Sequence, residues 1–421
     1  MRIELICTGD EVLSGKIVNT NYAHISRRLD EVGLDVIWGT TVGDDRARLL
    51  EAFQAAAARA DAVVVNGGLG PTVDDLSQEI AAEAAGDRLE LRQEWLQRME
   101  KHFAQRGRQM PPNNRKQAML PTTAELIDNP VGTACGFALD IGSARFFFTP
   151  GVPRELHRML DEEVIPRLAA MTGGSTLHRL KRFHSFGIGE SRADAMLADV
   201  LDLAPDGGIK LGFQAHYPEL ETKLAARGAS EEEIRRNLEP VADEVRRRLG
   251  NFVLAEDDDT LESVILDLLA RRDMTIAVGE IGTNGMISGR LAGRRGPNGA
   301  FRRGIIAADI GEAFAALGLS GAHNGASSEA SQCVARGVMS LAETTHGLSV
   351  LVEASPTANG RPAGGVIHIA VATGNSAAPR SAEIVGDEHR VRLGAVEMGL
   401  DCLRRHLVGL PIEERVDFEK G

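Results

Sequence analysis

The sequence contains few aromatic residues, few lysines and few cysteines. Aromatic residues make up 4% of its 421 residues, with two tryptophans and two tyrosines, which argues against a surface that stacks many bases. Lysine occurs seven times, and no lysine lies between Lys223 and Lys420. The four cysteines lie far apart without a CxxC pair, so we expect no disulfide framework and a reducing compartment.

Positive charge and long apolar runs are also scarce. The 47 Lys and Arg residues against 60 Asp and Glu residues leave a net charge of −13, so we do not expect DNA as a partner. No stretch approaches the roughly 18 apolar residues that a membrane span requires, and the first residues show no signal-peptide pattern. The sequence therefore predicts a cytoplasmic protein without a membrane segment.

The length suggests about three domains, because roughly 150 residues per domain is usual. Residues 1–170 alternate short apolar runs with apolar residues spaced three and four apart. This pattern is typical of a doubly wound α/β domain with a parallel sheet. The runs that we expect to form strands are Ile3–Cys7, Val36–Thr41, Ala62–Val65 and Phe146–Thr149.

Two smaller patterns follow along the chain. Residues 175–252 predict a small α+β domain, in which Ser230 and Glu233 form a capping box at the start of a helix. Residues 258–412 predict a third domain of the α/β class, and we expect Asp259 and Glu262 to cap its first helix. Its expected strands are Thr275–Val278, Leu348–Glu353 and Val366–Val371.

Polar and glycine-rich segments follow the predicted strands of the first domain. Such loops gather at the edge of a parallel sheet where ligands bind. We expect Gly67, Gly68 and Gly70 to present backbone amides to phosphate, and Thr72 to cap the next helix. Each segment alone is compatible with a structural role, but together they favour a nucleotide-type phosphate site. The other candidate substrate-binding residues are Asn19, Asn21, Asn114, Gln117, Asn129, Gly132, Thr133, Gly151 and Glu155.

Carboxylates accompany this phosphate site. Asp10 and Glu11 follow the first strand, and we expect Asp74 and Asp75 in the first turn of the helix after the third. Carboxylates repel phosphate unless a divalent cation such as Mg²⁺ bridges them, and a water on that cation can become the nucleophile. We predict that Asp10, Asp74 and Asp75 bind the metal. Which carboxylate binds the ion and which activates water stays open.

Five segments of the first domain resemble the CinA family, whose first domain is of the molybdopterin-binding MoaB/MogA type. They are TGDEVLSGKIVNTN, NGGLGPTVDD, NRKQAMLP, NPVGTACG and FFTPGVPRE, in this order. HSFGIGES and KLGFQAHYPELETKLAA are similar to the KH-like middle domain of that family. The resemblance covers essentially the whole chain. It implies a metal-dependent ADP-ribose pyrophosphatase in the first domain and a nicotinamide mononucleotide amidohydrolase in the last.

The third domain departs from the family pattern. Where the family has its serine nucleophile, a tyrosine and a lysine, this sequence has Ile281, Ala308 and Ala313. Hydrolysis of an amide by a serine requires a hydroxyl and a base, and residues 258–412 contain no lysine and no tyrosine. We therefore predict an amidohydrolase-like domain that lacks the activity.

Our leading hypothesis is a metal-dependent hydrolase of a nucleotide diphosphate such as ADP-ribose, which we expect to be a homodimer. In this hypothesis Lys16 and Lys116 neutralise charge on the leaving phosphate. One alternative is a pterin- or nucleotide-binding protein without hydrolysis, and another is a regulatory or scaffold protein. A further alternative is an amidohydrolase that uses unrecognised residues.

Overall fold

The computed structural model describes residues 1–420 except 174–176, 205–206, 294–298, 321–324 and 355–363. The chain divides into two compact units, one formed mainly by residues 1–179 and the other mainly by residues from Leu180 onward. The predicted start of the second domain, at residue 175, lies outside the described residues. Among the described residues, no helix is both long and apolar enough to cross a membrane.

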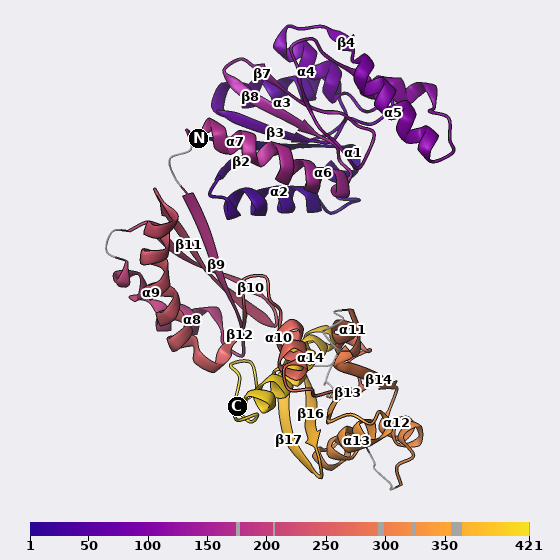
Figure 1. Cartoon of the computed structure of the whole chain (residues 1–421), viewed down its shortest axis with the longest axis vertical. Helices are drawn as coiled ribbons and strands as arrows, with labels where there is room; N and C mark the ends of the chain where they lie inside the picture. Colours follow the sequence, from indigo (N-terminus) through magenta and orange to yellow (C-terminus); the bar gives the residue numbers. More distant parts are fainter. Residues whose placement is uncertain (174–176, 205–206, 294–298, 321–324, 355–363, 421) are drawn as a thin grey trace. The chain divides into compact units, whose positions relative to one another are not determined.

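The first domain contains a six-stranded sheet with the order β2-β1-β3-β8-β7-β6 (Figure 1). The first four strands in this order are parallel, and β7 and β6 continue the sheet in antiparallel pairing. The strands are β1 (Ile3–Thr8), β2 (Val36–Val42), β3 (Ala62–Asn66), β6 (Glu125–Ile127), β7 (Gly136–Ile141) and β8 (Ala144–Thr149). The four strands predicted for this domain are confirmed.

Helices cover both faces of this sheet. They are α1 (Asp10–Leu13), α2 (Thr20–Glu31), α3 (Arg46–Arg59), α4 (Ser77–Ala85), α5 (Gln93–Gln105), α6 (Pro153–Met159) and α7 (Ile165–Met171). Shorter elements are the 3-10 helix η1 (Pro112–Ala118), the π-helical turn η2 (Leu160–Val164) and the paired strands β4 (Leu89–Leu91) and β5 (Met119–Pro121).

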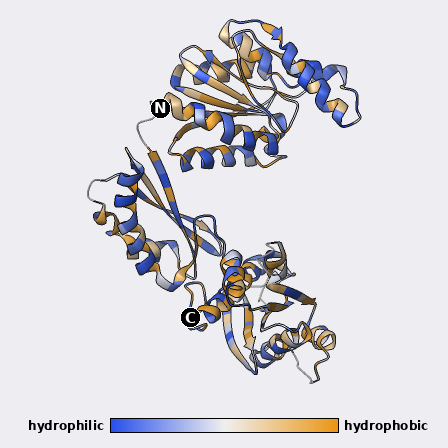
Figure 2. Cartoon of the chain, viewed as in Figure 1, coloured by the Kyte–Doolittle hydropathy of each residue, from blue (hydrophilic) through white to orange (hydrophobic). Residues whose placement is uncertain are grey.

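Two apolar cores explain the continuous hydrophobic strands. Val63 and Val65 of β3 pack with Phe53 of α3 on one face, whereas Val64 packs with Ile25 of α2 on the other. A strand that is buried on both faces is apolar without alternation, and the apolar run Ala62–Val65 predicted such a strand. Figure 2 shows the strands of this sheet as largely hydrophobic and the outer sides of the helices as hydrophilic. The doubly wound α/β fold is therefore confirmed.

The second domain contains a four-stranded sheet with the order β10-β11-β9-β12. Its elements are β9 (Leu177–Phe186), α8 (Glu190–Leu197), η3 (Val200–Leu203), β10 (Ile209–His216), β11 (Glu219–Gly228), α9 (Glu231–Leu249), η4 (Gly250–Phe252) and β12 (Val253–Glu256). The capping box is half formed. Ser230 accepts from the amide of Glu233, but the Glu233 carboxylate accepts from the amide of Ala229 instead of that of Ser230.

The third domain contains a five-stranded sheet with the order β14-β13-β15-β16-β17, in which the last two strands are antiparallel to their neighbours. Its strands are β13 (Ile276–Ile281), β14 (Phe301–Ala307), β15 (His346–Ala354), β16 (Gly364–Thr373) and β17 (Ser376–Val385). Its helices are α10 (Leu261–Ala270), α11 (Met286–Gly293), α12 (Ile310–Leu317), α13 (Ser328–Leu341) and α14 (Glu388–Val408).

The predicted cap of the first helix in this domain is wrong. Thr260 is the N-cap of α10, and its side chain and that of Ser263 form a reciprocal capping box. Asp259 instead accepts a hydrogen bond from the Ser263 hydroxyl. A threonine one residue later competes for the same backbone donors, so the acidic run alone misplaced the helix start by one residue.

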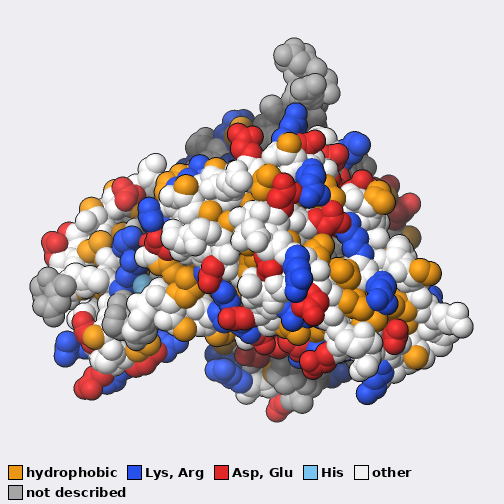
Figure 3. Space-filling view, turned by 90° about the horizontal axis from the view of Figure 1, so that it is seen from above, with side chains coloured by type: hydrophobic (Ala, Val, Ile, Leu, Met, Phe, Trp, Pro, Cys, Tyr) orange, Lys and Arg blue, Asp and Glu red, His pale blue; other side chains and the backbone are white. Residues whose placement is uncertain are grey.

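Charges of both signs are interspersed among the described residues on the face shown in Figure 3. Many charged side chains of the described residues form ion pairs, such as Arg46 with Glu79 and Glu83, and Arg145 with Glu125. Such exposed pairs contribute about 0–1 kcal/mol each to stability. Arginines on this chain, whose net charge is −13, thus often lie beside carboxylates.

Candidate active site

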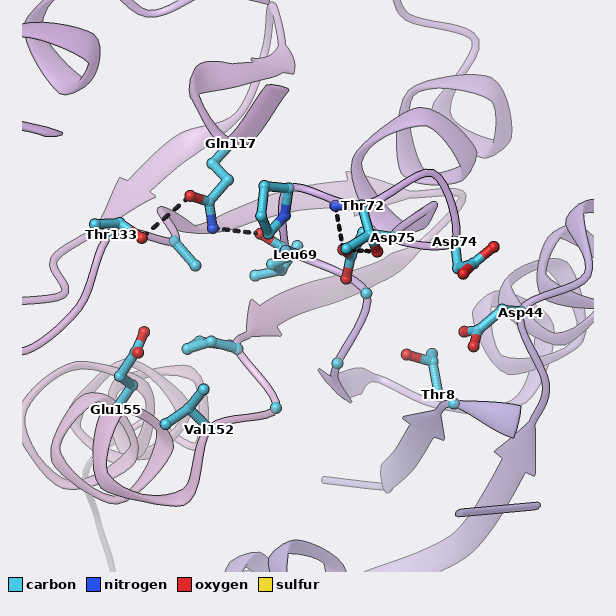
Figure 4. Close-up of a pocket in the computed structure, with 18 of the residues that line it drawn as sticks. Thr8, Asp44, Leu69, Thr72, Asp74, Asp75, Gln117, Thr133, Val152 and Glu155 are labelled. Atoms are coloured by element: carbon cyan, nitrogen blue, oxygen red, sulfur yellow. Dashed lines mark hydrogen bonds between the residues drawn. The ribbon is translucent and has the colours of Figure 1, made fainter. Parts of the chain in front are cut away.

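A pocket of about 540 Å³ lies at the carboxyl ends of β1, β3 and β8 (Figure 4). The chain passes from β1 to β2 on one side and then returns to β3 on the other, so the pocket lies where the strand order reverses. Open parallel sheets bind their ligands at such a point. The loops after all four parallel strands contribute to the lining, through residues such as Glu11, Asp44, Gly68 and Gly151.

The loop after β3 requires its glycines. Gly67 and Gly68 have positive φ angles of 113° and 70°. A Cβ atom at Gly67 would lie 2.5 Å from the Thr8 hydroxyl, and one at Gly68 would lie 2.3 Å from the hydroxyl of Ser77. The amide of Gly67 donates to the carbonyl of Thr149 at 2.9 Å, so this amide is already engaged within the protein. The glycines therefore allow close packing of three loops as well as access to a ligand.

The end of this loop differs from the sequence prediction. Helix α4 begins at Ser77 and its N-cap is Leu76, so Thr72 does not cap it and Asp74 and Asp75 precede it. The amide and hydroxyl of Thr72 donate to one carboxylate oxygen of Asp75 at 2.8 and 2.6 Å. A Cβ at Gly70 would lie 2.4 Å from the same carboxylate. Asp75 thus shapes the loop through its side chain.

An acidic end of the pocket is formed by Glu11, Asp44 and Asp74. Sequence reasoning missed Asp44, although it follows the end of β2 and so lies on the same sheet edge. Asp10 does not line the pocket. Its amide donates to the Asp44 carboxylate at 3.1 Å, and its own carboxylate accepts from the Asp44 amide at 3.2 Å. Burial raises the pKa of Asp44 above its ordinary value, and the negative charges of Asp10, Glu11 and Asp74 raise it further.

Neither predicted lysine lines this pocket. The Lys116 ammonium donates to the carbonyl of Thr72 at 3.1 Å and lies 3.5 Å from the Glu79 carboxylate. Lys16 is exposed on the loop after α1. Among the described residues that line the pocket, none is a lysine or an arginine. A phosphate group in the pocket would therefore lack a positive protein charge.

A divalent cation that arrives with phosphate fits these residues. No group of three or more Asp, Glu, His or Cys side chains in the described part of the chain is arranged to hold a metal by itself. Mg²⁺, however, usually binds one or two carboxylates together with substrate phosphates and water, and Glu11, Asp44 and Asp74 line one end. The buried Thr8 hydroxyl also lines the pocket and has no partner among the described residues, so it can bond to a ligand oxygen.

Two predicted substrate-binding asparagines hold the loops in place. Asn19 is the N-cap of α2, where its side chain accepts from the amide of Tyr22 at 2.9 Å. Asn21 is buried and donates to Asn66 at 2.9 Å and to the carbonyl of Gly151 at 2.8 Å. Asn21, in the first turn of α2, therefore connects this helix to the end of β3 and to the loop after β8.

The opposite wall is fixed by a second amide network. Gln117 donates to the carbonyl of Leu69 at 3.1 Å and accepts from Asn114 and from the Thr133 hydroxyl at 2.9 and 3.1 Å. Figure 4 shows this network directly beside the glycine-rich loop. Asn114, Gln117 and Thr133 thus line the pocket and position its loops at the same time.

Glu155 enters the pocket from the first turn of α6. Asn129 donates to one of its carboxylate oxygens at 2.6 Å and accepts from the amides of Val131 and Gly132. Burial raises the pKa of Glu155 above its ordinary value, whereas the bond from Asn129 lowers it. A Cβ at Gly132 would lie 2.1 Å from this carboxylate, so any side chain there would displace the Glu155 carboxylate from its present position.

At the corresponding edge of the third domain, the described residues after β13 are packed or hydrogen-bonded within the protein. Ile281 is 7% exposed at the end of β13 and belongs to an apolar core with Ala313 and Phe314, while Ala308 is exposed before α12. The neighbouring Glu280 is 1% exposed. Its carboxylate accepts from both hydroxyl and backbone groups, namely Thr283 Oγ1, the Ile287 amide and the amide and hydroxyl of Ser288, at 2.6–3.1 Å.

Comparisons with known proteins cover all three domains. Residues 4–170 match the family model described as a probable molybdopterin binding domain, residues 180–255 match the CinA KH domain, and residues 258–407 match the CinA C-terminal domain. A CinA-like protein of Geotalea uraniireducens is 36% identical over 424 residues, which span 99% of this chain and 100% of that protein.

A second relative carries a more specific name. The nicotinamide-nucleotide amidohydrolase PncC of Shewanella oneidensis is 36% identical over 416 residues, which span 97% of this chain and 96% of that protein. A CinA-like protein of Frankia casuarinae is 37% identical and matches over the full length of both chains. Identity at this level along the whole chain, together with the three matched domains, places the protein in the CinA family.

Proposed function

We propose that the first-domain pocket hydrolyses the pyrophosphate bond of a nucleotide-sugar diphosphate such as ADP-ribose, with a divalent cation. The observation that carries this proposal is a pocket at the point where the strand order reverses, with three carboxylates at one end and no cationic side chain among its described lining residues. Such a pocket accepts phosphate only together with a cation. The substrate class comes from the ADP-ribose pyrophosphatase activity that the resemblance to the CinA family implies.

Each carboxylate has a distinct task in this proposal. Glu11 and Asp44 hold the ion, which supplies charge neutralisation and a more acidic water. Asp74 has no hydrogen-bond partner among the described residues, so its carboxylate is available to take a proton from the attacking water. The water oxygen forms a bond to one phosphorus, and the bond from that phosphorus to the bridging oxygen breaks. The bridging oxygen leaves on the second phosphate, giving AMP and ribose phosphate.

The direct test is a panel of divalent cations with ADP-ribose as substrate and AMP release as the readout. We expect release with Mg²⁺ or a similar ion and none with a chelator. Failure to release AMP with any cation would contradict hydrolysis and favour the binding alternative.

A second candidate is binding of a pterin or nucleotide without hydrolysis. It is favoured by the match of residues 4–170 to a probable molybdopterin binding domain. Mass spectrometry of the native protein separates the two, because a retained pterin would support this candidate.

For the third domain we propose loss of amidohydrolase activity, despite the name of the Shewanella oneidensis relative. The support is that the aligned nucleophile position is a buried isoleucine, and that the adjacent Glu280 already accepts four hydrogen bonds. Ammonia release from nicotinamide mononucleotide tests this, and specific turnover would show that other residues serve.

A further inference from the structure

The pocket of the first domain has two chemically different ends (Figure 4). Asp44 and Asp74 lie at one end, and Glu155 and Val152 lie at the other, with the loop of Leu69 between them. A diphosphate held beside that loop would extend one part of the ligand toward Glu155. The side chains around Glu155 therefore indicate what that part of the ligand is.

Most polar groups at this end are already bonded within the protein. The amide of Gln117 and that of Asn129 both have donor and acceptor partners, and the carbonyl of Thr133 accepts from Trp95 at 3.0 Å. One oxygen of Glu155 accepts from Asn129, and the other, Oε1, has no partner among the described residues. Glu155 Oε1 is thus a free acceptor facing the pocket.

The surroundings hold this acceptor in place and select against phosphate. The bond from Asn129 orients the carboxylate, and Gly132 leaves room for it because it has no side chain. Val152, whose side chain is 52% exposed, lies beside it and offers an apolar surface. A carboxylate repels a phosphate but accepts from hydroxyl and amine groups, and an apolar neighbour suits a sugar or base.

We infer that Glu155 accepts a hydrogen bond from the organic part of the nucleotide and so selects ligands that carry a sugar hydroxyl or an exocyclic amine there. This assignment rests on the proposed function of the same pocket. It makes Glu155 a specificity-determining residue, whereas Glu11, Asp44 and Asp74 act on the phosphates.

The test measures the affinity of the full chain for three ligands by calorimetry, with Ca²⁺ present and product formation monitored. The ligands are ADP-ribose, its inosine analogue without the exocyclic amine, and a deoxy analogue without one ribose hydroxyl. We expect the wild-type protein to bind one analogue about 10- to 100-fold more weakly than ADP-ribose, the loss typical of a hydrogen bond to a charged group. Glu155→Gln should remove this difference, because the glutamine oxygen would keep the bond from Asn129 and its NH₂ group, a donor, would take the place of Oε1.

Glu162→Gln is the matched control, since this exposed carboxylate follows α6 and pairs with Arg158 at 2.9 Å without lining the pocket. It should bind all three ligands like the wild type. The inference is overturned if Glu155→Gln keeps the wild-type preference, or if it weakens ADP-ribose, both analogues and inorganic pyrophosphate equally. ADP-ribose binding to the wild type in Ca²⁺, together with no AMP release under any cation of the panel above, would overturn the proposed hydrolysis alone, whereas no binding to the wild type would overturn both.

Discussion

The first and third domains share one arrangement of strands but differ in the chemistry at the sheet edge. In each, the first strand lies between its second and third strands, as β1 lies between β2 and β3 and β13 between β14 and β15. At the end of β1, carboxylates line a pocket. At the end of β13, the carboxylate of Glu280 is buried and accepts four hydrogen bonds.

In our proposal this difference separates a working site from an edge of the same topology that has lost its activity. The buried Glu280 carboxylate has all its hydrogen bonds inside the protein. The exposed Asp74 carboxylate and Glu155 Oε1 have no partner among the described residues, so they are open to water or a ligand. If the third domain has lost its activity as proposed, its sheet edge has kept the strand order without the groups that perform chemistry, because that order depends on the apolar core.

The largest expected effect is loss of hydrolysis when Asp74 is neutralised. Asp74→Asn should lower kcat for ADP-ribose by about 10³-fold, because removal of a positioned base typically costs 10²–10⁴-fold. Asp140→Asn is the control, since this carboxylate is 69% exposed at the end of β7 and does not line the pocket. Steady-state AMP release measures both. Activity of Asp74→Asn within about twofold of the wild type would place the base elsewhere.

In the third domain, a serine at the position of the family nucleophile should lower stability and should not restore amidohydrolase activity. Ile281→Ser places the family nucleophile in an apolar core, which should lower the free energy of unfolding by about 3 kcal/mol. Ile281→Val, which keeps the core apolar, should cost only about 1 kcal/mol. Denaturant unfolding measures the loss, and ammonia release from nicotinamide mononucleotide measures the activity. Turnover by Ile281→Ser would mean that the domain still holds a functional base.

The fold was readable from the sequence because it depends on repeating patterns. The uninterrupted apolar run of Ala62–Val65 predicted a strand buried on both faces, and two cores now cover it. The edge on which the site lies followed from the same reasoning, since loops after parallel strands meet there. Caps were less predictable, because Thr260 competes with Asp259 for the same amides.

Individual roles in the site depend on loop conformation, which the sequence does not reveal. Asp75 turns back to Thr72, so the helix starts later than expected and Asp75 shapes the loop. Lys116 bonds to the carbonyl of Thr72 and does not reach the pocket. Asp44 was missed because its neighbours form no motif, although its place after β2 could have indicated it.

A buried cluster of charges around Glu397 of the third domain predicts an effect of pH on stability. Arg290 donates to Glu397 at 2.5 Å and to Glu262 at 2.7 Å, and Glu219 of β11 also faces Glu397. Burial raises the pKa of Glu397 to about 7, and the negative charges of Glu219 and Glu262 contribute. Glu397 Oε1 has no hydrogen-bond donor among the described residues when Glu397 and Glu219 are both ionised. A proton kept on either carboxyl allows a hydrogen bond between them.

The sign of the effect follows from this raised pKa. The folded protein retains a proton on Glu397 that the unfolded chain releases near pH 4.5. The free energy of unfolding is therefore highest, as far as this group is concerned, below pH 4.5, and it falls as the pH rises toward about 7. The slope is at most about 1.4 kcal/mol per pH unit for one proton. Glu397→Gln should flatten it in thermal unfolding measured across this range. Glu388→Gln, on the same helix and 66% exposed, should leave it unchanged, and an equal flattening by both would contradict the assignment.

The smallest expected effect concerns a residue that the sequence placed in the site and the structure places in a helix cap. Asn19→Ala removes the acceptor for the Tyr22 amide and should lower the free energy of unfolding by about 1 kcal/mol. Because Asn19 does not line the pocket, the KM for ADP-ribose should change by less than about twofold. Asp45→Ala, which removes the cap of α3, should cost about the same stability. A tenfold rise in KM for Asn19→Ala, without one for Asp45→Ala, would mean that the loop after β1 moves onto the ligand. Asn19 would then belong to the binding site as well as to the helix cap.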